Sequence, residues 1–592
     1  MANALSEAAD EVMKAHLPPG IRIRMALYSS MQRMFFVLAY KALLLGNWVR
    51  RKTDHEQVIV GYPELTEVRS FGLNIGRFDN LFLGLALEAR DSLPSSVRLI
   101  AHAYRTDGER QLSDMGHVGR SLRERGFLAL NLPSSVVLSK LSSKGFRLRT
   151  GDRRQGGNPL DVVVIRECEL IDETVAYLRK RGCRVGYDRL GWMRNMHLER
   201  GRIDRGKSDF TEWFLKVGRS LFERRGVPYE CFQDAALRIL VGRVYDALEF
   251  AGPLTEKIMD VVGRKGERTV FLTNGLTLPT ERLFYQCCRV LGKVVFGFEH
   301  GVTAGLSQLS AVQCAHAGIR ESDRMVCFSD SSARQYVKDG DSNGHRAVVG
   351  APALLRRLRF KRFQRLLSRL VYGMRIRGRI ILYATLVSQN NTVYGPFGQN
   401  DHFYFEITKK VIFDILARTR DLCIIKLYPS YRYIDPDPFG TIVEFPPNVK
   451  ALQFVELRYL RSLYDVVICD SPQSTLGWVW SSGVPLIFLD LPSNPLLPEI
   501  AGAFDNAIFR VDCSKEGWED EVRKLLSLPH WKLVEEWRQK EPIRKRIERE
   551  VLFGPPGISG QKAAEYVLEE SSRWYRGKQR NLYKEGAQDN GA

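Results

Sequence analysis

Short apolar runs alternate with longer amphipathic stretches along most of the chain from residue 55 onward. The runs are rich in β-branched and aromatic residues, as buried strands are, and the stretches between them repeat apolar residues at helical spacing. The clearest unit is a run at 160–167, an amphipathic stretch at 168–182 and a second run at 183–188. This alternation predicts a parallel sheet covered by helices on both faces. The strands expected in this first set are 56–62, 97–104, 160–167, 183–188, 268–275 and 293–301.

A second set of the same kind follows residue 378. Because one hydrophobic core rarely grows beyond about 300 residues, a chain of 592 residues is expected to hold two domains. The predicted fold class is therefore α/β, with two Rossmann-like parallel-sheet domains that face a central cleft. The strands expected in the second set are 379–386, 421–429, 464–470 and 484–492, with helices at 402–419 and 473–482.

Three further segments flank these domains. Residues 21–52 are apolar with basic flanks, but Arg33 and Lys41 interrupt them, so they fall short of the roughly 20 apolar residues of a spanning helix. We expect a basic helical arm that lies on a membrane surface or on the protein itself. The last fifteen or so residues, from 578, have the composition of a frayed tail. The expected divisions are 1–54 for the arm, 55–352 for the N-terminal domain, 353–378 for a basic linker helix, 379–515 for the C-terminal domain, and 516–592 for C-terminal helices and tail.

The net charge of the chain limits the classes of binding partner that are expected. The formal net charge of +20 favours an anionic partner, which can be nucleic acid, an acidic membrane or a phosphorylated substrate. Residues 353–379 carry ten basic side chains and no acidic one, above leucines at helical spacing. This linker is either a solvated interdomain helix or a helix that docks on anionic phospholipid. Between Arg356 and Arg369 the only aromatics are Phe360 and Phe363, which are too few to stack on bases, so we expect an anionic membrane surface and no nucleic acid as partner.

The cysteines and the start of the chain indicate the compartment. The ten cysteines form no CxxC pair and no Cys/His spacing of a zinc site. The first residues lack the charged start, apolar middle and cleavage site of a signal peptide. We therefore expect a cytoplasmic protein that is peripherally associated with the inner face of the cytoplasmic membrane.

Polar residues at the expected strand ends are the candidates for chemistry, because ligands of open parallel sheets bind beyond the carboxyl ends of the strands. In the first domain one strand ends in Glu299, His300 and Gly301. The imidazole of His300 suits a general base, Glu299 is a second candidate, and Gly301 permits a turn with positive φ. Asn274, at the end of the preceding strand, would flank the same mouth of the sheet. The alternatives are a capping histidine and a simple turn at Asn274.

The second domain offers candidates for binding phosphate. Lys426 ends an apolar strand, where a cation is costly to bury without an anionic partner. Ser474 and Thr475 open a helix, where hydroxyls, free amides and the helix dipole favour an anion. Plain N-capping is the alternative there. The other candidates at these strand ends are Ser388 and Asn390 in the polar loop after the first strand, Tyr428 and Asp470.

The order of these motifs resembles cytoplasmic glycosyltransferases of the GT-B fold. Within them it is most similar to the transferases of bacterial capsule, O-antigen and teichoic-acid assembly, over roughly residues 265–492. The motifs that carry the resemblance are His-Gly at 300–301, CFSDSS at 327–332, VVGAP at 348–352, Lys-x-x-Pro at 426–429, Asp-x-x-x-Ser-Thr at 470–475 and Gly-x-Pro at 483–485.

The resemblance implies roles for particular residues. His300 would face the cleft between acceptor and donor, Lys426 would contact the donor, and Ser474 with Thr475 would bind the donor phosphates. The chain departs from the family at two positions: Glu299 stands where glutamine or lysine is usual, and Tyr428 stands where histidine is usual.

The function expected from both lines is transfer of a sugar from a nucleotide-sugar donor to a growing or lipid-linked surface glycan. Lysine and helix amides would offset the charge of the leaving nucleotide, so we expect no metal and no cofactor. The alternatives are a CDP-polyol phosphotransferase of teichoic-acid type, a sugar-nucleotide epimerase, and a basic protein that binds nucleic acid or membrane without catalysis.

Overall fold

The computed structural model describes parts of the chain in full and two strands by their backbone alone. The expected arm at 1–54 and most of the expected linker helix lie outside the described residues. The described ranges are 160–188, 190–194, 252–276, 279–302, 304–308, 322–335, 345–356, 364–366, 369, 378–385, 401–427, 439, 443–452 and 455–589, with the backbone of 57–63 and 98–104.

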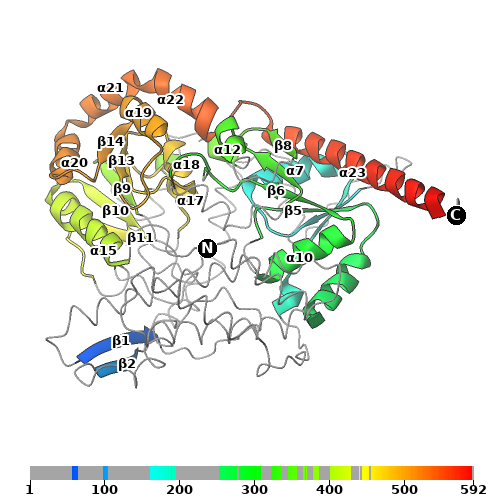
Figure 1. The fold of residues 1–592 in the computed structure, drawn as a ribbon. Coiled ribbons are helices and arrows are strands. Elements are labelled where there is room, and N and C mark those ends of the chain that lie inside the picture. The colour runs from blue at the N-terminus through cyan, green and yellow to red at the C-terminus, as the bar shows by residue number, and fades with distance from the viewer. Residues whose placement is uncertain are drawn as a thin grey trace.

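The first large sheet has six parallel strands in the order β4-β3-β5-β6-β7-β8. Every residue of β5 and β6 is buried, as expected for strands that are covered by helices on both faces. Figure 1 shows this sheet with its helices on one side of the molecule. Its elements are β3 (Asp161–Val164), α7 (Glu169–Lys180), β4 (Arg184–Tyr187), η2 (Gly191–Arg194), β5 (Thr269–Thr273), α10 (Pro279–Val290), β6 (Val294–Phe298), β7 (Arg324–Cys327), α12 (Asp330–Gln335) and β8 (His345–Val348).

The second large sheet also has six parallel strands, in the order β11-β10-β9-β12-β13-β14. The two sheets confirm the prediction of two Rossmann-like domains. The elements are α13 (Ala353–Arg356), β9 (Ile380–Ala384), α15 (Asp401–Lys410), η3 (Val411–Ile415), η4 (Leu416–Arg418), β10 (Leu422–Lys426), β11 (Val449–Leu452), α17 (Leu457–Leu460), β12 (Val466–Cys469), α18 (Ser474–Trp480), β13 (Leu486–Asp490), α19 (Pro498–Ala507), β14 (Phe509–Asp512), α20 (Trp518–Ser527), α21 (His530–Gln539) and α22 (Glu541–Ile547).

The first two expected strands do not join the first large sheet. They are β1 (Gln57–Pro63) and β2 (Arg98–Tyr104), which pair in parallel with each other in a sheet of their own. Figure 1 shows this pair apart from both large sheets. The expectation that all six runs of the first set share one sheet is therefore wrong, because periodicity identifies a strand without identifying its neighbour.

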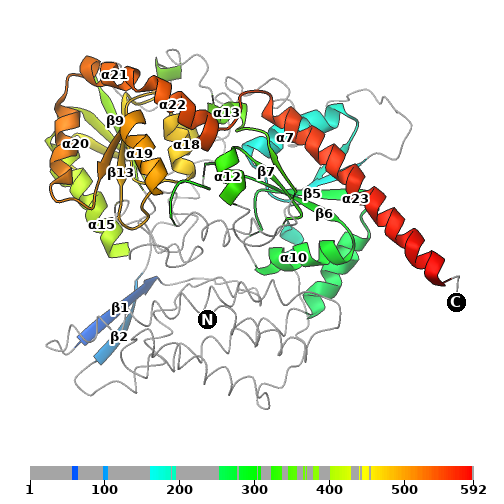
Figure 2. The same cartoon turned by 45° about the horizontal axis from the view of Figure 1, so that its top comes forward.

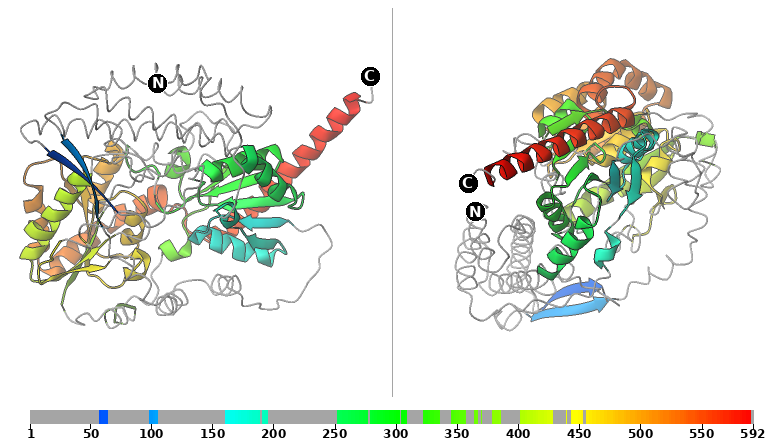
Figure 3. Two further views of the ribbon diagram at one scale, coloured as in Figure 1. Left: turned by 90° about the horizontal axis from the view of Figure 1, so that it is seen from below. Right: turned by 90° about the vertical axis from the view of Figure 1, so that its right-hand side faces the viewer.

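The C-terminal segment returns to the first domain through η6 (Glu548–Leu552) and α23 (Ser559–Asp589). Glu570 of α23 pairs with Arg324 of β7 at 2.7 Å, and the Tyr575 hydroxyl donates to the carbonyl oxygen of Thr269 at 2.7 Å. Figure 2 shows α23 lying across the first domain beside α7, and the left view of Figure 3 shows its end beyond the strands. The helix continues to Asp589, which differs from the expected frayed tail, because a helix that is already packed propagates easily.

Two segments connect the domains, one around Ala353 and one around Gly560, and both contact Glu173 of α7. Its carboxylate accepts a hydrogen bond from the amide of Ala353 at 2.7 Å, and Gly560 packs directly against it. Arg356 donates to the carbonyl oxygens of Ala351 at 2.7 Å and of Phe553 at 2.8 Å. Both connections are therefore tied to one helix of the first domain.

Candidate active site

The strand order of the second sheet marks a position for ligand binding. The chain leaves β9 toward β10 on one side and returns to β12 on the other, so the order reverses between β9 and β12. Ligands of open parallel sheets bind beyond the carboxyl ends of the strands at such a reversal. Asp470 follows β12 directly, and Lys426 ends β10. Two candidate residues thus lie at the edge of the sheet where this fold is expected to bind its ligand.

The loops after β6 and β12 bring the two domains together. A Cβ atom added at Gly301, which has a φ of 72°, would lie 2.6 Å from the Cβ of Ser474. A Cβ added at Gly477 would lie 2.9 Å from Cγ2 of Val302. The strand ends of the two sheets therefore face each other across a close contact, which is the arrangement expected for the GT-B fold.

His300 and Glu299 take opposite directions at the end of β6. The side chain of His300 is exposed, whereas Glu299 is only 1% exposed. The Glu299 carboxylate accepts hydrogen bonds from the amide of Phe328 at 2.6 Å and from the hydroxyl of Ser332 at 2.8 Å. Burial raises the pKa of Glu299 to about 8. Glu299 is thus directed into the first domain, toward the junction of β7 and α12, and a direct role as a base in the cleft does not fit its position.

Lys426 is buried at the carboxyl end of β10, as its place in an apolar strand predicts. Its side chain is 8% exposed, and its ammonium group donates to the carbonyl oxygen of Leu427. Asp470 is 3% exposed and accepts a hydrogen bond from the Tyr383 hydroxyl at 2.7 Å. Asp470 therefore ties the end of β12 to β9 at the point where the strand order reverses.

The remaining candidates divide into described and undescribed residues. Ser474 and Thr475 are half-buried at the start of α18, and Ser474 is the residue that meets Gly301. Asn274 is also half-buried, at the end of β5, and its amide donates to the carbonyl oxygen of Glu167 at 2.8 Å, which ties the ends of β5 and β3 together. The candidates that lie outside the described residues are Ser388, Asn390 and Tyr428.

One ion pair across the domain junction was not predicted from the sequence. Arg458 of α17 pairs with Glu169, the first residue of α7, at 2.7 Å. Arg461 in the same segment is fully buried and donates to the carbonyl oxygen of Leu354 at 2.7 Å, and burial lowers its pKa to about 10. An acidic residue in the first turn after a buried strand is the signal that marks Glu169, because such a residue lies at the ligand edge of the sheet.

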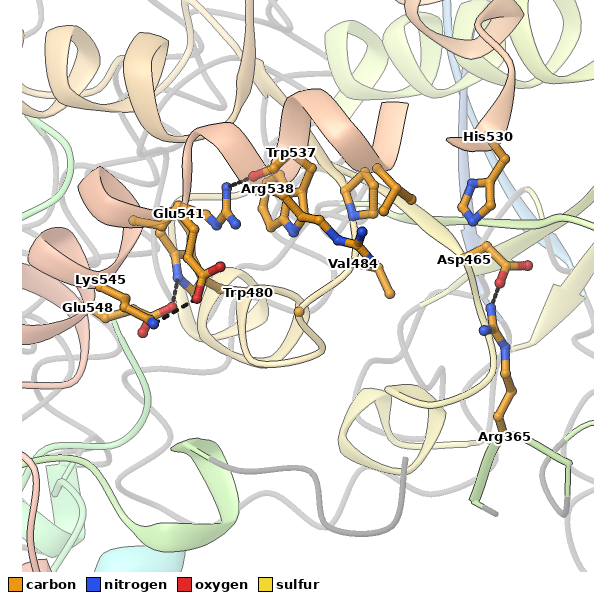
Figure 4. Close-up of a pocket in the computed structure, with 14 residues that line it drawn as sticks. Arg365, Asp465, Trp480, Val484, His530, Trp537, Arg538, Glu541, Lys545 and Glu548 are labelled. Atoms are coloured by element: carbon orange, nitrogen blue, oxygen red, sulfur yellow. Dashed lines mark hydrogen bonds and ion pairs between the residues drawn. The ribbon is translucent and has the colours of Figure 1, made fainter. Parts of the chain in front are cut away.

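A pocket of about 570 Å³ lies at the opposite edge of the second sheet (Figure 4). Asp465, which precedes β12, and Val484, which precedes β13, both line it. His530 and Trp537 of α21 form another part of its wall (Figure 4). The pocket thus opens at the amino ends of the strands and is separate from the strand ends that carry Lys426 and Ser474.

Part of the expected basic linker is used inside the protein. Arg369 pairs with Asp465 at 2.8 Å, and Arg365 contacts the same carboxylate. Asp465 also accepts a hydrogen bond from the amide of Ile380 at 2.8 Å, so these arginines help to hold the start of β9. Together with Arg356, at least three arginines of the basic run are committed to intramolecular contacts, and they do not form a solvated or membrane-facing row.

The described residues offer neither a metal-binding cluster nor a membrane-spanning helix. No group of three or more His, Cys, Asp and Glu side chains in the described ranges is arranged to hold a metal ion. Of the helices in the part of the chain that the structure describes, none is both long and apolar enough to cross a membrane.

Comparisons with known proteins find distant structural likenesses. No protein-family model matches the chain. No curated protein matches it either. HepE of Anabaena in complex with UDP and glucose is similar at 11% identity and a TM-score of 0.36, over 69% of this chain and 100% of that one. A trehalose-phosphate synthase (UDP-forming) of Burkholderia vietnamiensis is similar at 12% and 0.37, over 70% and 100%. MurG of Acinetobacter baumannii is similar at 13% and 0.34, over 70% and 100%. At such low scores, the fold assignment rests on the strand orders and the facing strand ends described above.

Proposed function

We propose that the protein is a glycosyltransferase that moves a sugar from a nucleotide-sugar donor to a growing or lipid-linked surface glycan. The observation that carries the proposal is the contact of Gly301 with Ser474. It brings the loop with an exposed histidine against the loop that follows β12, at the reversal of strand order where an open parallel sheet binds its ligand. A base from one domain and a phosphate site from the other would then share one cleft.

The donor would lie mainly against the second domain. The cation of Lys426 is buried at the ligand edge, and the hydroxyls of Ser474 and Thr475 open the helix that follows β12 at the same edge of the sheet. A lysine in this position would offset the negative charge that grows on the phosphates as the nucleotide leaves. Ser388 and Asn390, which follow β9 in the sequence, are proposed as further phosphate ligands because β9 lies at the same reversal.

The acceptor would enter from the first domain. Imidazole is the side chain best suited to act as a general base near neutral pH, so His300 would accept a proton from an acceptor hydroxyl. Glu299 would act as a positioning residue, since its hydrogen bonds to Phe328 and Ser332 fix the end of β6 from which His300 extends. Asn274, on the neighbouring strand end, would flank the acceptor.

The proposed location is the inner face of the cytoplasmic membrane. Support comes from the net charge of +20 and from the basic residues of 353–379 other than Arg356, Arg365, Arg369 and Arg379, which are paired inside the protein. Anionic lipid attracts such residues by about 1 kcal/mol for each cation near the surface. A membrane-bound acceptor would then be within reach of the cleft.

A screen of activated donors tests the proposal. The protein is incubated with CMP-, CDP-, UDP-, GDP- and dTDP-linked sugars and with CDP-polyols, and both thermal stability and donor consumption are measured. A bound donor stabilises the native state by mass action, so at least one nucleotide-sugar should raise the Tm and be consumed when an acceptor glycan is present. Consumption of CDP-polyols alone would favour polyol-phosphate transfer, and binding of none of these compounds would contradict the proposal.

A further inference from the structure

A short stretch of backbone pairing joins the two domains on the side of the strand ends. Ser307, in the segment after β6, forms an antiparallel bridge with Leu496, in the segment after β13. The bridge therefore crosses from one domain to the other. Its two hydrogen bonds run from the amide of Gln308 to the carbonyl oxygen of Pro495 at 3.0 Å, and from the amide of Leu497 to the carbonyl oxygen of Leu306 at 2.9 Å.

Each half of this contact is anchored in its own domain. On one side, the Asp490 carboxylate at the end of β13 accepts a hydrogen bond from the amide of Leu496 at 3.2 Å and pairs with Arg510 at 2.7 Å. On the other side, Gly305 turns with a φ of 76° so close to Ser331 that an added Cβ would lie 2.6 Å from the hydroxyl oxygen. If the two domains move apart at this edge, the two hydrogen bonds of the bridge must therefore break.

The bridge covers a small apolar contact. Leu306 and Leu496 are 0% and 3% exposed, and Val302, which packs on Gly477 of the other domain, is 1% exposed. This contact favours the closed arrangement, because separation would expose apolar side chains. It is small beside the two six-stranded sheets that it joins, so it can open without unfolding either of them.

We propose that residues 304–308 and 494–497 form a latch that closes the cleft at this corner and opens when substrates exchange. His300 lies only a few residues before the latch, and Gly301 touches Ser474. The closed latch therefore keeps the segment that carries His300 next to the start of α18. The catalytic consequence rests on the proposed function, whereas the existence of the latch does not.

Hydrogen exchange of the wild-type protein tests the latch without any assay of catalysis. The amides of Gln308 and Leu497 should exchange faster than those inside β6 and β13, because latch opening is a local event. Exchange of all four regions at one common slow rate would overturn the proposal, since the latch would then open only when the whole protein unfolds.

A proline substitution separates the hydrogen bond from side-chain packing. Leu497 has a φ of −60°, which proline adopts, so Leu497→Pro fits the local backbone. It removes the amide donor and places the ring carbon Cδ against the carbonyl oxygen of Leu306, which now accepts that hydrogen bond. Leu497→Ala keeps the donor and is the matched control. We expect exchange at Gln308 to be faster by about fivefold or more in Leu497→Pro than in Leu497→Ala, because the proline variant loses one hydrogen bond and its ring crowds the Leu306 carbonyl oxygen. Equal exchange in the two variants would contradict the latch.

A disulfide across the bridge links the latch to turnover. Ser307 and Leu496 are a non-hydrogen-bonded antiparallel pair, whose Cα atoms lie about 4.5 Å apart, within the range that a disulfide spans. Oxidation of Ser307→Cys with Leu496→Cys should lower turnover at least tenfold, and reduction should restore it, with the single variants unaffected. Full turnover in the oxidised double variant would overturn the proposal.

Discussion

Gly301 and Ser474 belong to different domains, yet their backbones approach so closely that no side chain larger than hydrogen fits at position 301. The φ of 72° at Gly301 and the 2.6 Å that an added Cβ would leave to the Cβ of Ser474 both require glycine. The contact fixes how the first domain presents His300 to the second.

The first prediction concerns the glycine itself. Gly301→Ala should lower the free energy of unfolding by about 1–2 kcal/mol, because alanine disfavours the left-handed backbone conformation. Overlap of its Cβ with Ser474 should lower it by about 1–3 kcal/mol more and push the two domains apart at the cleft. Gly182→Ala is the matched control, because Gly182 has a φ of 83° but nothing within 4 Å of an added Cβ. Urea unfolding measures the difference. Equal losses in the two variants would show that the approach to Ser474 is not tight.

The second prediction concerns the buried cation. Lys426→Met removes the charge at the end of β10 while keeping an apolar stem of similar length. We expect donor affinity to fall at least tenfold, because hydrogen bonds to charged groups contribute about 1.5–3 kcal/mol. Calorimetric titration with the donor found in the screen measures this loss. Lys410→Met, which removes a surface partner of Glu519, should leave affinity unchanged, and an equal fall in both variants would rule out a specific role for Lys426.

The third prediction is a pH dependence of stability from Glu299. Its pKa of about 8 in the folded protein exceeds the ordinary value of 4.5 because the carboxyl is buried. The folded state therefore binds more protons than the unfolded state between these values, so the free energy of unfolding should fall as pH rises from about 5 to 8. Each pKa unit corresponds to about 1.4 kcal/mol, which makes the fall a few kcal/mol.

Glu299→Gln provides the comparison for this pH dependence. The amide oxygen can still accept from Phe328, but the side chain no longer titrates. The slope of unfolding free energy against pH should become shallower in this variant without vanishing, since burial also raises the pKa of Glu173 to about 7. An unchanged slope would mean that Glu299 has the same pKa in both states.

The fourth prediction separates two uses of the basic linker. Arg369→Gln should destabilise the fold by about 2–4 kcal/mol, because it leaves part of the charge of buried Asp465 without its partner. A second variant should keep its stability and lose binding to anionic vesicles in co-sedimentation. Its substitutions to glutamine are at Arg357, Arg359, Lys361 and Arg362. If the wild type does not sediment with such vesicles, the membrane proposal fails.

Local pattern accounts for most of the strands that position the site. Both the run that becomes β6 and the run that becomes β12 are continuous and apolar, and each ends in polar residues at the edge where the cleft forms. The buried place of Lys426 could also be predicted, since a lysine inside an apolar strand has few other positions.

The local sequence pattern does not predict which residues far apart in the chain come into contact. The separate pairing of β1 with β2 and the return of α23 to the first domain depend on contacts between residues far apart in the chain. The direction of Glu299 is set in the same way, because its partners Phe328 and Ser332 come from the next strand and helix. Local spacing does not distinguish an acid that faces the cleft from one that faces the core.

The central claim is that His300 acts on an acceptor beside a donor held by the second domain. Turnover and donor affinity measured together in wild type and His300→Ala test it most directly. The account predicts that His300→Ala lowers turnover by at least a hundredfold, as expected for loss of a general base, while donor affinity and the free energy of unfolding stay unchanged. Wild-type turnover in His300→Ala would contradict the account.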